Sequence, residues 1–330
     1  MKPRLVFVHG IGGPRDAAAD LDEWLRACAA GARAAGHSAH VSGLTSGWAS
    51  DARFAYYGDL FRTVGAQGGG APGTAPPTVP GSGSDADENA ELLAALLLEV
   101  TDERLADPSL APAEARALHD ARSRLAPPAG AQGAGAAGRR VVNAVTSLLA
   151  VPGLRLVGGR LSARLTVGML GQVARYLNRG ESDGATTLDQ RIRARVAACL
   201  DPDRPNIVVA HSLGTVVALE TLHEHPAEVS LLVTLGSPLG VRTAVQPRVR
   251  PNPLATPATV ARWLNFWDRD DLVAARPLLE GFVRPSATAV APTSHRVDSD
   301  GAWVHPAATY LAQPAVAGPL VEALTTLAGR

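Results

Sequence analysis

The stretch from residue 206 to residue 214, Asn-Ile-Val-Val-Ala-His-Ser-Leu-Gly, constrains the fold more than any other part of the chain. Its apolar run from Ile207 to Ala210 is typical of a strand buried on both faces of a parallel sheet. The residues from Leu213 to His223 follow with the spacing of a helix packed on that strand. A small residue two positions before Ser212, and Gly214 two positions after it, let strand and helix approach closely. The stretch therefore predicts a sharp strand-to-helix turn with a serine at its bend.

This spacing resembles the Gly-x-Ser-x-Gly nucleophile elbow of the α/β-hydrolases, in which a strained turn lifts the serine hydroxyl above the edge of the sheet. Ala210 occupies the position of the first glycine. The resemblance implies that Ser212 is a nucleophile. An ordinary strand-to-helix turn is the structural alternative, because a small-x-Ser-x-Gly string is common by chance.

Short apolar runs alternate with helix-like segments along much of the chain. Strands are expected at residues 5–8, 40–41, 53–57, 229–235, 260–267 and 287–291, and helices at residues 16–35, 187–200 and 316–327. Such alternation predicts an α/β fold with a mostly parallel central sheet flanked by helices. With the elbow, it resembles the lipase and esterase side of the α/β-hydrolase superfamily over roughly the first sixty residues and from Thr187 to the end. A single domain over residues 1–330 is expected.

A different kind of sequence separates the first strands from the nucleophile strand. Residues 65–87 and 127–138 are mostly Gly, Ala and Pro, and they predict flexible loops because they cannot bury enough apolar surface to offset the entropy of ordering. Helical patterns occur at residues 88–105, 112–125, 141–149 and 161–177. Residues 63–186 are therefore expected to form a helical insertion, which in a hydrolase would be a lid over the pocket. A packed helical cap is favoured, and contact with a membrane surface or a partner protein is the alternative.

The segment after the first strand, His9-Gly10-Ile11-Gly12-Gly13, is a second candidate for the site. In the α/β-hydrolases a His-Gly segment after an early strand supplies one backbone N–H of the oxyanion hole, and the residue after the nucleophile supplies the other. The resemblance implies the amides of Ile11 and Leu213 as the donors. The residues that support the two turns are then His9, Gly10 and Gly214. A structural turn and a phosphate-binding loop are the alternatives, but the segment lacks the dinucleotide pattern and the lysine of a P-loop.

A serine needs a base, and the base needs an orienting acid, before the hydroxyl becomes a good nucleophile. The order that the resemblance implies is Ser, then Asp or Glu, then His. Only His295 and His305 follow the acidic cluster at residues 268–271. We prefer His305, because it lies between the expected last strand and the C-terminal helix, where the hydrolases carry their base. His295 lies in a polar loop nearer the strand and is the alternative.

Three aspartates just past an expected strand are candidates for the acid. The string from Trp263 to Val273 resembles the lipase and esterase pattern in which the second aspartate of Asp-x-x-Asp orients the histidine. It implies Asp271 as the acid, with Asp270 as the next choice. Asp268 is interpreted as a structural residue that bonds loop backbone, as Asp often does. The alternative is that all three carboxylates only solvate a turn.

These residues together imply a serine hydrolase that cleaves a carboxylic ester, either a lipid or another small acyl ester, through an acyl-enzyme. A peptidase, amidase or thioesterase with the same triad is one alternative, and a non-catalytic interaction module on this fold is another, because fold does not fix function. The chemistry calls for no metal and no organic cofactor. Three aromatic residues are expected either to line an acyl pocket or, as we favour, to belong to the core: Tyr56, Tyr57 and Phe61.

The composition narrows the expected partners and location. Lys and Arg total 31 and so do Asp and Glu, with no basic block, so a nucleic acid is not an expected partner. No uninterrupted apolar stretch reaches about 20 residues, so no transmembrane helix is expected. The first residues lack a signal-peptide cleavage site, which predicts a cytoplasmic location. Cys28 and Cys199 match no metal or redox spacing and are interpreted as buried free thiols.

Overall fold

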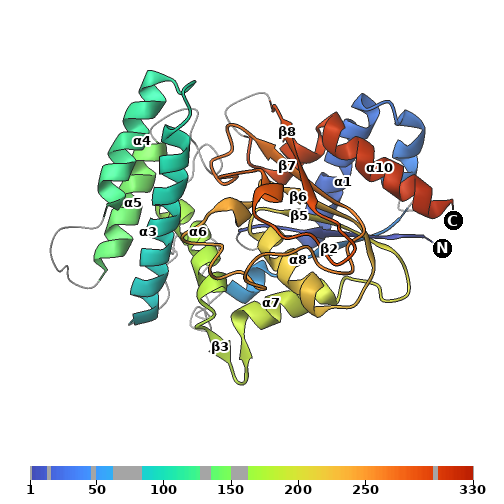
Figure 1. Cartoon of the computed structure of the whole chain (residues 1–330), viewed down its shortest axis with the longest axis horizontal. Helices are drawn as coiled ribbons and strands as arrows, with labels where there is room; N and C mark the ends of the chain where they lie inside the picture. The colour runs from blue at the N-terminus through green and yellow to red at the C-terminus, as the bar shows by residue number, and fades with distance from the viewer. Residues whose placement is uncertain are drawn as a thin grey trace.

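The structure is a computed structural model that describes residues 2–12, 16–45, 50–61, 84–126, 135–149, 163–299 and 304–329. Its centre is a six-stranded sheet with the strand order β2-β1-β5-β6-β7-β8, in which every neighbouring pair is parallel. The strands are β1 (Arg4–Val8), β2 (Asp51–Ala55), β5 (Asn206–His211), β6 (Val229–Leu235), β7 (Trp263–Asp268) and β8 (Pro292–Val297). The prediction of an α/β fold with a parallel central sheet flanked by helices is confirmed (Figure 1).

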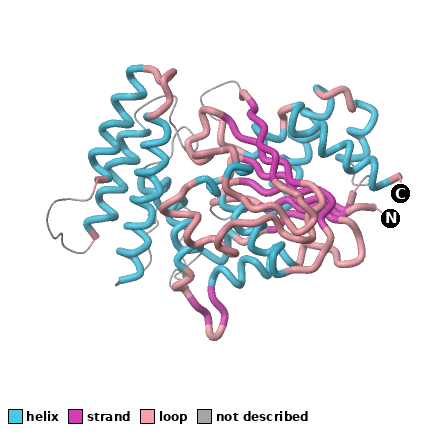
Figure 2. Tube along the Cα trace, in the orientation of Figure 1, coloured by secondary structure: helices cyan, strands magenta, loops and turns pink. Residues whose placement is uncertain are grey.

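Helices cover both faces of this sheet, and this explains why its central strands are mostly apolar. Leu5 and Phe7 of β1 face α1 (Ala17–Ala34), α9 (Ala307–Leu311) and α10 (Pro314–Ala328). Val6 and Val8 alternate with them and face the core formed with α7 (Leu188–Ala197) and α8 (Leu213–Glu224). Figure 2 shows the resulting layers, with the strands between two sets of helices.

Four α-helices lie between β2 and the small hairpin that precedes α7, within the described residues. They are α3 (Ser84–Leu105), α4 (Pro112–Leu125), α5 (Ala136–Leu149) and α6 (Ala163–Asn178), followed by a hairpin of β3 (Ser182–Asp183) and β4 (Thr186–Thr187). In Figure 1, α3, α4 and α5 form a group at one end of the molecule, and α6 lies between this group and the sheet. Apolar side chains of all four helices belong to the same core as α8. The described part of the insertion is therefore a packed helical cap.

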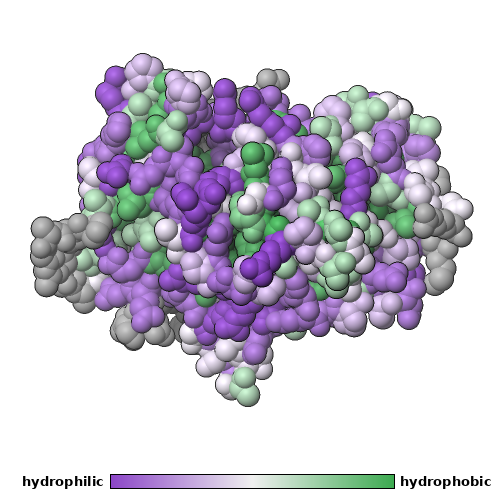
Figure 3. Space-filling view, in the orientation of Figure 1, coloured by the Kyte–Doolittle hydropathy of each residue, from purple (hydrophilic) through white to green (hydrophobic). Residues whose placement is uncertain are grey.

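Within the described ranges, no helix combines the length and the apolar character needed to cross a bilayer. Polar side chains predominate on the face shown in Figure 3, where hydrophobic residues form only small patches.

Two strand predictions were wrong. Residues 40–41 end a 3₁₀ helix (Ser38–His40) and begin α2 (Val41–Thr45), because one apolar side chain, buried against α1, does not require a strand. The last strand occupies Pro292–Val297 instead of residues 287–291. A turn precedes it, in which the N–H of Ser286 donates to the carbonyl of Val290 at 2.8 Å and Ala289 has a φ of 62°.

The boundaries of the two expected loops also differ from the prediction. Residues 84–87 belong to α3 and residues 136–138 to α5, whereas residues 65–83 and 127–134 lie outside the described residues. The carboxylate of Asp87 accepts a hydrogen bond from the N–H of Gly135 at 2.9 Å, which ties the beginnings of the two helices together. Cys28 is a buried free thiol as expected, but Cys199 is partly exposed because it follows the end of α7.

Candidate functional site

The topology creates a crevice between the carboxyl ends of β1 and β5. The chain passes from β1 to β2 on one side of β1 and returns to the other side with β5, so the strand order changes direction between β1 and β5. Ligands of open α/β sheets bind at such a switch point, outside the carboxyl ends of the strands. His9 follows β1 and Ser212 follows β5, so both candidate stretches of the sequence lie at this crevice.

Ser212 occupies a strained turn between β5 and α8. Its φ is 54° and its ψ is −129°, a conformation that costs about 1–3 kcal/mol in a residue with a side chain. A Cβ on Gly214 would lie 2.4 Å from the carbonyl oxygen of His9, and a Cβ on Gly10 would lie 2.6 Å from the Cβ of Ser212. Both glycines are therefore required for the loop after β1 to touch the turn that carries Ser212.

The three side chains selected from the sequence form one chain of hydrogen bonds. The Oγ of Ser212 lies 3.1 Å from Nε2 of His305. The Nδ1 of His305 lies 2.9 and 2.8 Å from the two carboxylate oxygens of Asp271. Because a carboxylate only accepts, Nδ1 carries a proton, and in the neutral imidazole Nε2 is then the acceptor for the serine hydroxyl. The contacts between Ser212, His305 and Asp271 are those a nucleophile, base and orienting acid require.

Asp271 is held as an anion by its surroundings. Its burial favours the neutral acid, but the charge and hydrogen bond of His305, the hydroxyl of Tyr310 and the N–H of Val273 outweigh burial and keep the pKa of Asp271 below its usual value. Tyr310 donates to Oδ2 at 2.7 Å and Val273 to Oδ1 at 3.0 Å. Burial and the neighbouring charge of Asp271 raise the pKa of Tyr310 well above its usual value, so its hydroxyl stays a donor.

The other two aspartates point elsewhere. Asp270 accepts a hydrogen bond from the guanidinium of Arg104 on α3 at 2.9 Å. Asp268 accepts from the N–H of Asp270 at 2.9 Å and from that of Ser299 at 2.6 Å, so it shapes the loop. His295, the alternative base, is an exposed residue of β8 whose ring lies 5.5 Å from that of Phe266.

Three residues beside the triad were missed in the sequence. Besides Tyr310, these are His211, whose Nε2–H donates to the carbonyl of His305 at 2.6 Å, and Gly236, whose φ is 53°. A Cβ on Gly236 would lie 2.6 Å from Oδ2 of Asp271, so only glycine leaves room for the carboxylate. A glycine directly after a strand, as at Gly236, is a sequence signal from which this position could have been predicted. The contacts of Tyr310 and His211 depend on tertiary structure and left no signal.

The two expected oxyanion donors lie on the segments that meet at Ser212. Leu213 is the first residue of α8, where backbone N–H groups have no carbonyl partner within the helix. Ile11 follows Gly10, the residue in contact with Ser212, and is partly buried. His9 fixes the start of this loop. Its Nε2 accepts from the N–H of Tyr57 at 3.1 Å, and its carbonyl accepts from the hydroxyl of Tyr57.

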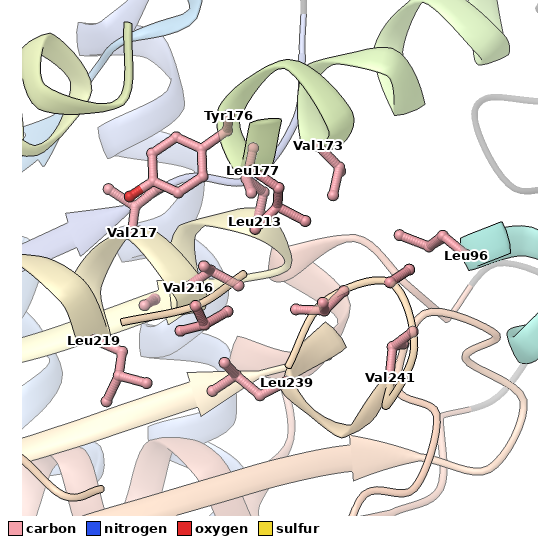
Figure 4. Close-up of a cluster of buried hydrophobic side chains, with 14 of the residues drawn as sticks. Leu96, Val173, Tyr176, Leu177, Leu213, Val216, Val217, Leu219, Leu239 and Val241 are labelled. Atoms are coloured by element: carbon pink, nitrogen blue, oxygen red, sulfur yellow. The ribbon is translucent and has the colours of Figure 1, made fainter. Parts of the chain in front are cut away.

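An apolar cavity of about 200 Å³ opens onto Ser212 and His305. This far exceeds the roughly 10–15 Å³ that one water needs, so the cavity can hold a group of several heavy atoms. Its cap-side wall is formed by Leu96, Leu97, Val100, Thr101, Leu148, Leu170 and Val173, and Val241 and Leu272 lie across from them. In Figure 4, Leu96 of α3, Val173 of α6 and Val241 surround one space.

The aromatic residues proposed for an acyl pocket are not among the residues that line this cavity. Tyr57 and Phe61 are buried in the core, as the favoured interpretation held. Tyr56 is partly buried, and its ring stacks on that of His9 at 5.5 Å. The apolar side chains on the cap side of the cavity come from the insertion instead.

Within the described residues, no group of three or more His, Cys, Asp or Glu side chains is arranged to hold a metal ion. Comparison with known proteins gave no match, since no family model, no curated protein and no solved structure matches this chain. The function must therefore be argued from the geometry of its own residues.

Proposed function

We propose that this protein is a serine hydrolase that cleaves carboxylic esters with an apolar acyl group. One observation carries the proposal: the hydrogen-bonded series Ser212, His305 and Asp271 opens into an apolar cavity, with the serine on a strained turn. Strain of this kind persists only where the surrounding structure enforces it, and it clusters at functional sites.

The arrangement supports a two-step reaction. Nε2 of His305 takes the proton of Ser212 as Oγ attacks the ester carbonyl, and the resulting imidazolium is stabilised by Asp271. The N–H groups of Ile11 and Leu213 are the proposed donors to the oxyanion. His305 then returns the proton to the alcohol as the C–O bond breaks. Water attacks the acyl-enzyme with His305 again as base, which releases the acid and restores Ser212.

The order of the site along the sheet supports an α/β-hydrolase fold over a nucleotide-binding fold with a similar parallel sheet. The nucleophile follows β5, the acid follows β7 and the base follows β8, in the order Ser, Asp, His that α/β-hydrolases use. The segment after β1 has neither the full dinucleotide pattern nor a P-loop lysine. We therefore propose an α/β-hydrolase fold as well as serine hydrolase activity.

The side chains that line the cavity indicate the chemistry of the acyl group of the substrate. The cap-side wall of the cavity is mostly aliphatic, so burial of an acyl chain against it would contribute about 0.8 kcal/mol for each methylene removed from water. The same triad would also attack a thioester or an amide. Rates for an ester, a thioester and an amide of one acyl group would separate these classes.

Labelling with a fluorophosphonate tests the proposal directly. We expect stoichiometric, covalent modification of the folded protein, with the adduct mapped by mass spectrometry to the peptide that contains Ser212. Heat-denatured protein should not react, because activation depends on His305. A folded protein that stays unlabelled, or an adduct on an exposed serine such as Ser123, would refute the proposal and favour a non-catalytic interaction module.

Filling the cavity should change acyl preference. Val173 is buried on α6 and lines the cavity, so Val173→Phe should lower kcat/KM for a long-chain p-nitrophenyl ester about 10-fold or more, while the acetate ester changes much less. Val142→Phe is the matched control, since Val142 is partly buried on α5 outside the cavity. Equal losses on short and long esters would show that the acyl chain lies elsewhere.

A further inference from the structure

A glutamine of the insertion pairs with the backbone of the loop after β1. The Oε1 of Gln172 accepts from the N–H of Gly12 at 3.0 Å, and its Nε2 donates to the carbonyl of Gly12 at 2.9 Å. Gln172 lies on α6 and is 8 % exposed. The two residues are 160 positions apart, so this pair joins the cap to the sheet at the loop that touches Ser212.

The loop is thereby fixed on both sides of Ile11. On one side, His9 is bonded to Tyr57 through its ring and its carbonyl, and Gly10 lies against Ser212. On the other side, both backbone groups of Gly12 are held by Gln172. With both neighbouring residues fixed, the peptide plane that carries the N–H of Ile11 has little freedom to rotate.

We infer that Gln172 is a positioning residue for the oxyanion hole, which makes α6 a fixed part of the active site. The inference rests on the proposed hydrolase function. An oxyanion donor is effective because it is oriented before charge develops, and loss of one donor typically costs about 10²–10³ in rate. Gln172 touches no reacting atom, so its effect passes entirely through the Gly12 backbone and the adjacent Ile11 amide.

The position of Gln172 also connects the acyl pocket to this loop. Leu170 and Val173 flank it on α6 and line the cavity. An acyl chain in contact with these side chains would therefore rest on the helix that orients the loop. Misplacement of a catalytic group by about 1 Å can cost about 10² in rate, so a small rotation of α6 is enough to matter.

The test compares Gln172→Met with Asn178→Met. The first removes both bonds to Gly12 and keeps the side-chain volume similar. The second, on the same helix, removes the 2.7 Å bond from Asn178 to Asn89 of α3 and leaves the loop untouched. The two hydrogen bonds between Gln172 and Gly12 contribute only a small part of the stability of a typical domain, so both variants should fold.

We expect Gln172→Met to lower kcat about 10- to 100-fold with KM within 3-fold of the wild type, whereas Asn178→Met keeps its kcat. The inhibition constant of a trifluoromethyl ketone, whose hemiketal oxygen would occupy the oxyanion hole, should rise by the same factor as kcat/KM falls. An unchanged kcat in folded Gln172→Met, or equal losses in both variants that follow their melting temperatures, would overturn the inference. Wild-type protein that neither hydrolyses esters nor reacts with fluorophosphonate would instead overturn the proposed function.

Discussion

Replacing Ser212 by Ala should lower kcat/KM for a cleaved ester by about 10⁴–10⁶-fold, because the members of a catalytic triad act as one unit and removal of the nucleophile removes the acyl-enzyme route. The hydroxyl is the only part of this side chain that contacts His305. Ser212→Ala should therefore stay folded and keep the apolar cavity. The measurement is initial rates on a p-nitrophenyl ester, with Ser123→Ala, which lies on the exposed side of α4, as the unaffected control.

A second substitution at this position separates chemistry from strain. Ser212→Gly should be equally inactive but should unfold at a higher temperature than Ser212→Ala, since glycine adopts a φ of 54° without the cost that a Cβ imposes. The difference expected in the free energy of unfolding is about 1 kcal/mol or more. Ser212→Ala with substantial residual activity would show that another group supplies the nucleophile. A less stable Ser212→Gly would show that the turn is not strained.

The sequence predicted the features that local pattern and chain order determine. The apolar run before Ser212 indicated a strand buried on both faces, and all six residues of β5 are buried. Chain order selected His305 over His295, and the structure brings His305 to Ser212 while His295 is exposed on β8. Both expected placements occur in the structure because a parallel sheet aligns the carboxyl ends of its strands at one edge.

Contacts between segments that are far apart in the sequence could not be predicted from local sequence pattern. The cap-side part of the cavity wall comes from α3, α5 and α6, and the sequence of each helix alone indicates only an apolar helix face. Tyr310 meets Asp271 through the packing of α9 beside the β7 end, and nothing in its own neighbours indicates this contact. The hydrogen bonds between Gln172 and Gly12 join a helix of the insertion to the glycine-rich loop after β1. Each of these contacts is set by tertiary packing.

The choice of Asp271 over Asp270 came from the Asp-x-x-Asp resemblance and not from chain order. Adjacent residues in a loop point in different directions, and chain order gives both the same rank. In the structure Asp271 is buried against His305, whereas Asp270 is half-exposed and is paired with Arg104 of the cap. The cap therefore contacts the loop after β7 through the pair of Arg104 and Asp270, and it contacts the loop after β1 through Gln172. Its position is coupled to both sides of the proposed active site.

Asp271→Asn should lower kcat/KM about 10⁴-fold, because an amide in place of the carboxylate no longer fixes the proton of His305 on Nδ1. The hydrogen-bond partners of Asp271 make Asp271→Asn more destabilising than the loss of one charge alone. Tyr310 donates to one carboxylate oxygen and Val273 to the other, so the amide NH₂ must face a donor in either orientation. A buried clash of two donors costs about 1–3 kcal/mol, and the melting temperature should fall as well. Fluorophosphonate labelling would report the remaining active fraction.

The neighbouring carboxylate supplies the matched control for this prediction. Asp270→Asn keeps an oxygen acceptor for Arg104 and loses the charge of half-exposed ion pairs with Arg104 and Arg269, each worth about 0–1 kcal/mol. Its kcat/KM should stay within about 3-fold of the wild type, and its melting temperature should hardly change. If Asp270→Asn were instead the inactive variant, the hydrogen bonds from His305 to Asp271 would not be those used in catalysis. Equal, small effects of both substitutions would mean that His305 needs no carboxylate partner to activate Ser212.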